Sequence, residues 1–503
     1  MLLQNLEFAL LESRFLSAFS LEVFLIVSTM LLLVWSLINQ NRGGLGHLTF
    51  SNSTKWTAVL ILLLSLYISS QSSLMAYHWL PLNGTLQLDP LTYNIRIIIL
   101  VSSLFFFFVS SIWFKENPSG SNELCCLVLL SIISLVILVS VNDFISLFLC
   151  IELQGLSFYV LACFRKNSDY SIEAGVKYFI TGAIASCLML FGISLIYGIS
   201  GSINFLELKQ IFACLPQPSF DGNSFQVTPM FVGLNLGLAF LMSALLFKLG
   251  AAPLHFWVAD VYEGSPSNVT AFFVLVPKIA IIVIIIRLLF DVFEPIAYFW
   301  QPILLQCAIL SVLIGTFGAI YQRRIKRLLA YSTVGHNGFL LLALTSSNQQ
   351  SLEAILTYVV VYTLTNICIF SYVLNVKERG SLKENPTFYE SCGVVKTNPL
   401  IGLAIALPLF SLAGIPPLLG FIAKYQIFLV AIQQGYIIVP TILVVTSVIG
   451  CYYYIRLTKV NFFEQGHLIW NNSLNRESSF LISLSVILIF ILTFLPRFFI
   501  VLA

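Results

Sequence analysis

A series of long apolar stretches constrains this chain more than any other feature of its sequence. About 20 residues of α-helix cross the hydrocarbon core of a bilayer, so each stretch of that length predicts one transmembrane helix. The predicted spans are residues 19–38, 56–77, 91–114, 123–141, 143–164, 174–197, 229–256, 268–290, 302–321, 326–345, 352–376, 399–434, 436–458 and 479–502. The sequence therefore predicts an all-α polytopic membrane protein with about 14 transmembrane helices.

The composition agrees with a membrane environment along most of the chain. Of 503 residues, 58% are hydrophobic and only 9% are charged, whereas about 25% are charged in ordinary soluble domains. The longest connections, residues 39–55, 198–228 and 377–398, are too short to fold as separate globular domains. A net charge of +3 gives no basic surface for a phosphate backbone, which excludes nucleic acid as a partner.

The distribution of basic residues predicts the orientation of the chain. Of the 25 Lys and Arg residues, sixteen lie in odd-numbered connections, four lie in even-numbered connections or the termini, and five lie within spans. Positively charged connections stay on the cytoplasmic or matrix side. Both termini are therefore expected on the opposite side, the periplasm or the intermembrane space.

Two of the predicted spans contain helix breakers. Span seven contains Gly250-Ala251-Ala252-Pro253 and span twelve contains Gly414-Ile415-Pro416-Pro417, and paired broken helices in two halves of a chain indicate an internal repeat. Because the two spans are five apart, the copies enter the membrane from opposite sides, which predicts two inverted five-helix repeats. The predicted units are an N-terminal three-helix segment (1–122), spans four to eight (123–291), spans nine to thirteen (300–458) and a C-terminal helix (479–503).

Four ionisable residues lie well inside predicted spans, where an ionised side chain costs on the order of 2.5–3.5 kcal/mol. They are Glu152 in span five, Lys248 before the break in span seven, Lys278 in span eight and Lys424 after the break in span twelve. Lysine suits proton transfer because burial and a nearby carboxylate change its proton affinity in opposite directions. Structural ion pairs between the spans are the alternative explanation of the same residues.

Two histidines are secondary candidates for proton relay. His255 follows the break in span seven and His336 lies in span ten, and imidazole both donates and accepts protons near neutral pH. Either ring could instead bond to a backbone carbonyl that a helix break leaves free. Four further charged residues lie near span ends, where hydration makes charge less costly, and are expected only to anchor loops: Arg96, Asp143, Asp260 and Glu263.

No motif for a redox cofactor or a metal is present in the sequence. The ten cysteines form no CxxC pair and no Cys/His ligand spacing, and neither a dinucleotide-binding fingerprint nor a P-loop occurs. We therefore expect no NADH, flavin, iron–sulfur, haem or metal site in this chain.

Several long segments resemble one family of membrane proteins. Two segments are similar to proton-conducting subunits of respiratory complex I: LLFKLGAAPLHFWVADVYEGSPSNVTAFFVLVPKIA and LFSLAGIPPLLGFIAKYQIF. These subunits are related to Mrp-type sodium/proton antiporters. Three segments favour the subunit-2 branch of that family: KRLLAYSTVGHNGF, DVYEGSP and IELQGLSFYVLACF. Two others, EAGVKYF and TSVIGC, look like mitochondrial members of this branch. The resemblance covers roughly residues 120–460.

The resemblance implies a role for each charged residue. Glu152 would be the span-five glutamate, Lys248 the lysine paired with it, Lys278 the central lysine and Lys424 the lysine on the exit side. The chain would translocate protons in the mitochondrial inner membrane while other subunits bind NADH, FMN, iron–sulfur clusters and ubiquinone. Its partners would be membrane-arm subunits, including the antiporter-like subunit 4 and the small membrane subunits, together with lipids.

Two other functions are compatible with the same residues. A free-standing Mrp-like cation/proton antiporter would share the lysines but would work without a quinone reductase. A structural scaffold would hold the charges as fixed ion pairs, and none of them would titrate during turnover.

Overall fold

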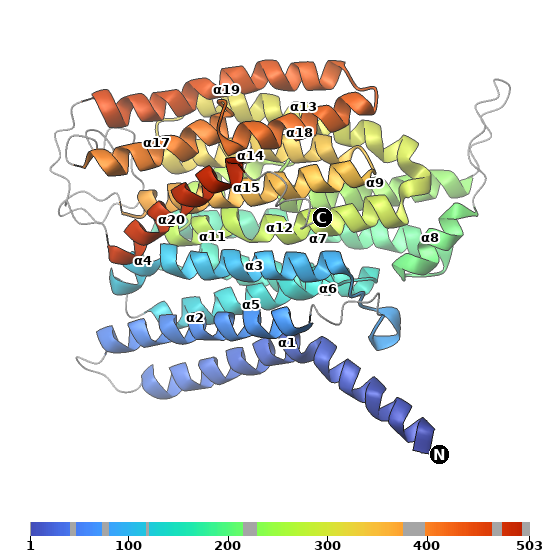
Figure 1. Ribbon diagram of the computed structural model, residues 1–503. Helices are drawn as coiled ribbons and strands as arrows, with labels where there is room; N and C mark the ends of the chain where they lie inside the picture. The colour runs from blue at the N-terminus through green and yellow to red at the C-terminus, as the bar shows by residue number, and fades with distance from the viewer. Residues whose placement is uncertain are drawn as a thin grey trace.

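The structure is a bundle of helices that lie roughly side by side (Figure 1). A computed structural model of the protein describes residues 2–40, 47–72, 80–116, 120–214, 229–375, 398–464 and 475–494. The first half contains α1 (Leu2–Gln40), α2 (His47–Ser72), η2 (Leu82–Gly84), α3 (Pro90–Val109), α4 (Ser111–Glu116), α5 (Ser121–Val139), α6 (Phe144–Ala162), α7 (Asp169–Ser200) and α8 (Phe205–Ala213). The rest contains α9 (Pro229–Leu249), α10 (Phe256–Gly264), α11 (Ser267–Leu275), α12 (Pro277–Ile286), η4 (Arg287–Val292), η5 (Glu294–Ile296), α13 (Ala297–Ile320), α14 (Ile325–Leu344), α15 (Gln349–Val373), α17 (Pro399–Ala413), α18 (Leu419–Gln433), α19 (Ile438–Phe463) and α20 (Arg476–Phe494).

The predicted all-helical, polytopic class is confirmed. Among the described residues, twelve helical segments are long and apolar enough to cross a membrane. Predicted span ten corresponds to α14, which has 20 residues but is less apolar than those twelve, and span twelve corresponds to the shorter apolar helices α17 and α18. The division into two inverted repeats stays a prediction.

Contacts between helix ends agree with spans that alternate in direction. Residues next to odd-numbered connections meet one another: Lys55 pairs with Glu477, Lys115 donates to Asn475 (3.0 Å), and Arg327 pairs with Glu263 (3.4 Å). Residues next to even-numbered connections also meet: Asn142 donates to Gly84 O (2.7 Å) and to Asn204 (3.2 Å), and Arg287 pairs with Asp89 (3.3 Å). The two sets of connections therefore lie at opposite ends of the bundle. Which end faces the matrix or cytoplasm stays a prediction.

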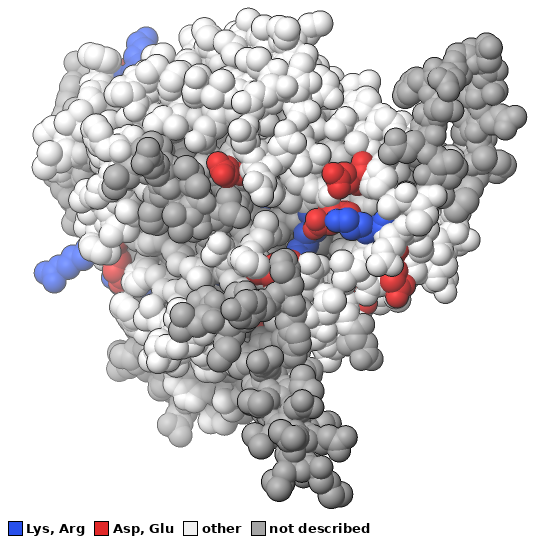
Figure 2. All heavy atoms as spheres, turned by 45° about the vertical axis from the view of Figure 1, so that its right-hand side comes forward, with Lys and Arg blue, Asp and Glu red and all other residues white. Residues whose placement is uncertain are grey.

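The bundle has a buried centre and a largely apolar outer surface. The share of residues that are buried in the most apolar 18-residue stretch of each span differs between the spans. This share is 100% in Ser267–Val292 but only 33% in Phe19–Ile38 and in Ile438–Phe463. Accordingly, α11 and α12 lie in the middle of the bundle, with α1 and α19 at opposite edges (Figure 1). On the face shown in Figure 2, most of the described residues are uncharged, and acidic and basic side chains gather in a few clusters. This surface suits lipid or neighbouring apolar helices.

Glycines allow two pairs of helices to approach closely. A Cβ added at Gly192 of α7 would lie 2.7 Å from Gly237 O of α9, and one added at Gly315 of α13 would lie 2.5 Å from Gly335 N of α14. Lipid tails are as apolar as leucine, so packing at small residues is a main source of helix association in a membrane. These contacts hold α9 against α7 and α14 against α13. Both α9 and α14 carry residues of the candidate site.

Helix breaks occur at both predicted positions and at one that was not predicted. Residues 250–255, including Pro253, separate α9 from α10, and residues 414–418, including Pro416 and Pro417, separate α17 from α18. Gly250 and Gly414 begin these breaks with φ of 74° and 87°, a conformation that glycine adopts without a Cβ clash. Predicted span eight is also interrupted, at Val276 before Pro277. Lys278 thus lies in the first turn of α12 and not midway along a continuous helix.

The expectation that charged residues near span ends are hydrated is wrong for Asp143, which is only 7% exposed, and for Arg96. Arg96 is only 1% exposed and forms an ion pair with Glu22 of α1, so it is a buried residue and not a hydrated anchor. Asp260 does pair with Lys177 of α7 (3.0 Å), and Glu263 pairs with Arg324 at the start of α14. These two carboxylates hold the end of α10 against its neighbours.

Candidate functional site

The four charged residues predicted from sequence come from four different helices. Glu152 lies on α6, Lys248 in the last turn of α9, Lys278 in the first turn of α12 and Lys424 on α18. Lys278 and Lys424 are 6% and 7% exposed, and Glu152 and Lys248 are partly buried. Their surroundings consist of tyrosine, asparagine and histidine side chains and free backbone carbonyls.

Lys248 contacts Tyr159 of α6, the helix that also carries Glu152. The Lys248 ammonium donates to Tyr159 Oη at 3.4 Å and lies 5.8 Å from the centre of its ring. A Cβ added at Gly155 would lie 3.4 Å from Lys248 Nζ, so this glycine leaves space for the ammonium against α6. Glu152 Oε1 is buried and has no hydrogen-bond partner among the described residues. In this conformation Lys248 therefore bonds to tyrosine, although the Glu152 carboxylate is close enough to interact with it electrostatically.

Asn337 of α14 connects the break after α9 to Lys278. Its Nδ2 donates to Leu249 O at 2.6 Å, and its Oδ1 accepts from Lys278 Nζ at 3.3 Å. Lys278 also donates to Tyr362 Oη of α15 at 3.4 Å. The central lysine thus has two polar partners, and one of them reaches the residue next to Lys248.

His336 lies between two tyrosines. Its Nδ1 is 2.6 Å from Tyr358 Oη and its Nε2 is 3.0 Å from Tyr454 Oη. Its ring centre is 5.2 Å from that of Tyr362, which bonds to Lys278. Both ring nitrogens therefore have a hydroxyl that can donate or accept a proton.

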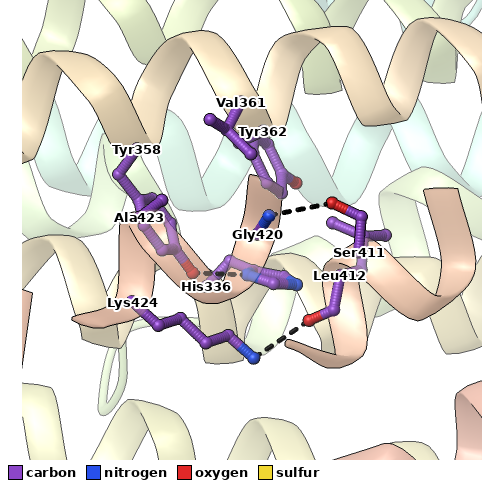
Figure 3. Close-up of a pocket in the computed structure, with 9 residues that line it drawn as sticks. All are labelled: His336, Tyr358, Val361, Tyr362, Ser411, Leu412, Gly420, Ala423 and Lys424. Atoms are coloured by element: carbon purple, nitrogen blue, oxygen red, sulfur yellow. Dashed lines mark hydrogen bonds between the residues drawn. The ribbon is translucent and has the colours of Figure 1, made fainter. Parts of the chain in front are cut away.

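Lys424 donates hydrogen bonds to the backbone carbonyls at the break after α17. Its ammonium donates to Leu412 O at 2.9 Å (Figure 3) and to Ala413 O at 3.0 Å. In a continuous helix these two carbonyls would accept from residues 416 and 417, which are prolines without an N–H group. A cation at the carboxyl end of a helix also interacts favourably with the helix dipole. Lys424 thus replaces two hydrogen bonds that the prolines remove.

Two small cavities connect Lys424 to His336. Both residues line a cavity toward Tyr358, Tyr362 and Ser411 (Figure 3) and a second cavity toward Ser332 and Tyr454. Each cavity has room for about one water molecule and contains hydroxyl groups that could bind it. The arrangement can support proton movement between the histidine and the lysine.

The structure distinguishes the two histidine candidates. His255 lies within the break after α9, where its Nδ1 is 3.3 Å from Pro253 O. Neither histidine has a hydrogen bond to a lysine among the described residues, but His336 lines two cavities with Lys424 and lies beside Tyr362, the partner of Lys278. The geometry of His255 is that of a side chain bonded to a freed carbonyl, which was the alternative that the sequence left open.

Five uncharged or aromatic residues of the site were not identified from the sequence. They are Tyr159, Asn337, Tyr358, Tyr362 and Tyr454, and each contacts a lysine or His336. A weak signal existed for one of them, because Asn337 follows His336 directly in a predicted span. Among the described residues, His, Cys, Asp and Glu side chains do not gather in any group of three or more that could bind a metal ion.

Comparisons with known proteins cover the whole of this site. The family model described as NADH:quinone oxidoreductase/Mrp antiporter, transmembrane, matches residues 141–450, a range that includes all four charged residues. NADH-ubiquinone oxidoreductase chain 2 of Marchantia polymorpha is 35% identical over 482 residues, which are 95% of each chain. NADH-quinone oxidoreductase subunit N of Paramagnetospirillum magneticum is 33% identical over 476 residues, 94% of each chain. A chain in the structure of respiratory complex I from Thermus thermophilus with bound aureothin is 26% identical, with a TM-score of 0.76 over 95% of this chain and 97% of that one.

Proposed function

This chain belongs to the NADH:quinone oxidoreductase/Mrp antiporter transmembrane family, and we propose that it moves protons across the membrane along the residues between Glu152 and Lys424. It is a membrane subunit of an NADH:quinone oxidoreductase complex. The observation that carries the proposal is that none of the three lysines has a carboxylate as its hydrogen-bond partner among the described residues. Lys248 and Lys278 bond to hydroxyls and an amide, and Lys424 bonds to backbone carbonyls. The His336 imidazole shares two cavities with Lys424. Hydroxyls and an imidazole can pass protons, whereas fixed carboxylates would hold each lysine permanently charged.

The first step is a change in the distance between Glu152 and Lys248. At about 5 Å and an effective dielectric constant near 20, a carboxylate stabilises an ammonium by roughly 3 kcal/mol. When Glu152 approaches, Lys248 binds a proton more tightly; when Glu152 withdraws, that stabilisation is lost and the Lys248 ammonium releases its proton toward the neutral amine of Lys278. Tyr159 keeps the ammonium hydrogen-bonded in the state without the carboxylate.

The later steps carry the proton from Lys278 to Lys424. Lys278 donates to Tyr362, whose ring lies beside His336. His336 accepts a proton on one ring nitrogen and releases another from the opposite nitrogen, through Tyr358 or Tyr454 or through water in the adjoining cavities. Lys424 receives the proton as its amine becomes an ammonium, and then releases it on the exit side.

The remaining assignments follow from membership of an oxidoreductase complex. We propose that NADH, FMN, iron–sulfur clusters and ubiquinone are bound by other subunits, and that this chain has no redox site. We also propose the mitochondrial inner membrane as its location, with both termini toward the intermembrane space. Its neighbours would be the antiporter-like subunit 4, the small membrane subunits and lipids.

Replacement of the central lysine tests the proposal. In the intact complex, Lys278→Ala removes the only ammonium that contacts both Asn337 and Tyr362 among the described residues. Proton pumping and NADH:quinone reductase activity should both fall by about tenfold or more, a typical effect of losing a proton-transfer group. Both activities would be measured in membranes in which assembly of the complex is verified.

Lys177→Ala is the matched control. Lys177 is 46% exposed and pairs with Glu173 and Asp260 on the outside of the bundle, so its loss should leave pumping unchanged. Full pumping by assembled Lys278→Ala complexes would rule out the proposed path and support the scaffold. Lysine-dependent Na⁺/H⁺ exchange by this chain without redox subunits would support the antiporter instead.

A further inference from the structure

The break after α9 leaves the Leu249 carbonyl without its helical partner. In a continuous helix Leu249 O would accept from the N–H of residue 253, but residue 253 is proline. An unsatisfied backbone carbonyl is costly inside a membrane because no bulk water is available. Asn337 supplies the missing donor at 2.6 Å, from a side chain that is only 1% exposed.

The two partners of Asn337 fix the orientation of its amide. The Leu249 carbonyl can only accept a hydrogen bond and the Lys278 ammonium can only donate one. Only the orientation with Nδ2 toward Leu249 and Oδ1 toward Lys278 satisfies both. The charge on Lys278 therefore helps to hold the amide in the position in which it bonds to α9.

At the break after α17, a lysine supplies the hydrogen bonds that the prolines remove, with no side chain between the lysine and the carbonyls. There the carbonyls that Pro416 and Pro417 leave free accept directly from the Lys424 ammonium. At the first break, Lys278 reaches the free carbonyl only through Asn337. A proton-carrying lysine thus contributes to the stability of each broken helix end.

We infer that Asn337 is a positioning residue that couples the proton on Lys278 to the end of α9 and hence to Lys248. A hydrogen bond from an ammonium is roughly twice as strong as one from a neutral donor, so deprotonation of Lys278 weakens its hold on Oδ1. The amide then holds Leu249 less firmly, and Lys248, the preceding residue, becomes freer to move relative to Tyr159 and Glu152. By linkage, a displacement of α9 reciprocally alters proton binding at Lys278.

The inference rests on the proposed proton path, and substitution of Asn337 in the intact complex tests it separately. Asn337→Asp removes the donor to Leu249 and places a carboxylate beside Lys278, which favours the ammonium. The pH profile of proton pumping should shift to higher pH by at least about one unit, as expected for a close opposite charge. The number of protons pumped per electron should also fall.

Asn461→Asp is the matched control, because Asn461 is a buried asparagine (3% exposed) near the end of α19. It should leave the pH profile unchanged. An Asn337→Asp complex that assembles and pumps with the parental profile and stoichiometry would overturn the inference. If that variant does not assemble, Asn337→Ser decides, because serine cannot reach both partners: lowered stoichiometry supports the coupling, and parental stoichiometry overturns it.

A Lys278→Ala arm distinguishes the inference from the proposed function. Loss of pumping in Lys278→Ala with parental behaviour in the Asn337 variants would refute the coupling and leave the proton path intact. Full pumping in Lys278→Ala would refute the path itself. A purely structural role for Asn337 would lower the amount of complex but would leave the number of protons pumped per electron in Asn337→Ser at the parental value.

Discussion

The close approach of α7 and α9 gives a prediction whose magnitude can be worked out from the structure. A Cβ added at Gly192 would lie 2.7 Å from Gly237 O and 2.8 Å from Leu241 N, both backbone atoms that cannot rotate away. An ordinary contact is about 3.5 Å, so Gly192→Ala should push α9 away by roughly 0.8 Å. Overpacking costs about 1–3 kcal/mol, against a gain of up to about 1 kcal/mol in helix propensity. The net loss of stability should be about 0–2 kcal/mol.

Gly198→Ala on the same helix is the matched control. A Cβ at Gly198 would meet nothing within 4 Å, so this variant gains the helix propensity without the clash. The difference between the two variants should be about 1–3 kcal/mol because the propensity term cancels. For a chain of 503 residues, this corresponds to a difference in Tm of about 1–3 °C.

Thermal denaturation of the purified complex, followed by release of this subunit, measures the difference. The displacement should also affect function, because α9 carries Lys248, whose 3.4 Å contact with Tyr159 is already long. Proton pumping should therefore fall in Gly192→Ala and not in Gly198→Ala. Equal Tm values and equal pumping in the two variants would refute the argument that this glycine contact sets the position of α9.

Two further predictions concern the histidines and Asp143, the acidic residue directly before the first residue of α6. His336→Ala should reduce proton pumping by about tenfold or more because it removes the proposed relay between two tyrosines. His255→Ala should leave pumping nearly unchanged. Equal losses of pumping in the two variants, measured in assembled complexes, would contradict this assignment. Burial raises the pKa of Asp143 to about 6, and the negative charge of Glu207 adds a smaller increase. The protonated form of Asp143 therefore stabilises the folded protein at low pH, and this stability is lost as the pH rises through about 6. Asp143→Asn should therefore raise the Tm of the complex at pH 7.5 and have little effect at pH 4, and an increase of the same size at both pH values would contradict the raised pKa.

The charged residues of the site could be predicted from sequence because they contrast with their surroundings. Lys278 stands in an otherwise apolar run, and the cost of a charge there makes it conspicuous whatever the fold. The prolines of the two breaks are equally visible, since proline removes a helical hydrogen bond at a known position. These signals depend only on the local sequence.

The uncharged partners could not be predicted because they depend on how helices cross. Many serines and threonines in the described spans bond to their own helix, as Ser131 and Thr333 do three residues back, so a polar residue in a span is not by itself a sign of function. Asn337 and Tyr362 are distinguished only because α14 and α15 bring them to Lys278. Glu22 and Arg96 show the same limit, since 74 residues separate the two members of that buried pair.

The helix breaks explain why the residues that we propose as proton carriers are also structural caps. A break in a membrane helix frees carbonyls that must find donors, and a lysine provides donors whose strength depends on its protonation. At the α17 break, loss of the Lys424 proton weakens two hydrogen bonds to the helix end at once. The scaffold explanation and the transport explanation therefore do not exclude each other: a side chain that stabilises the break in one protonation state and less in the other converts proton transfer into a structural change.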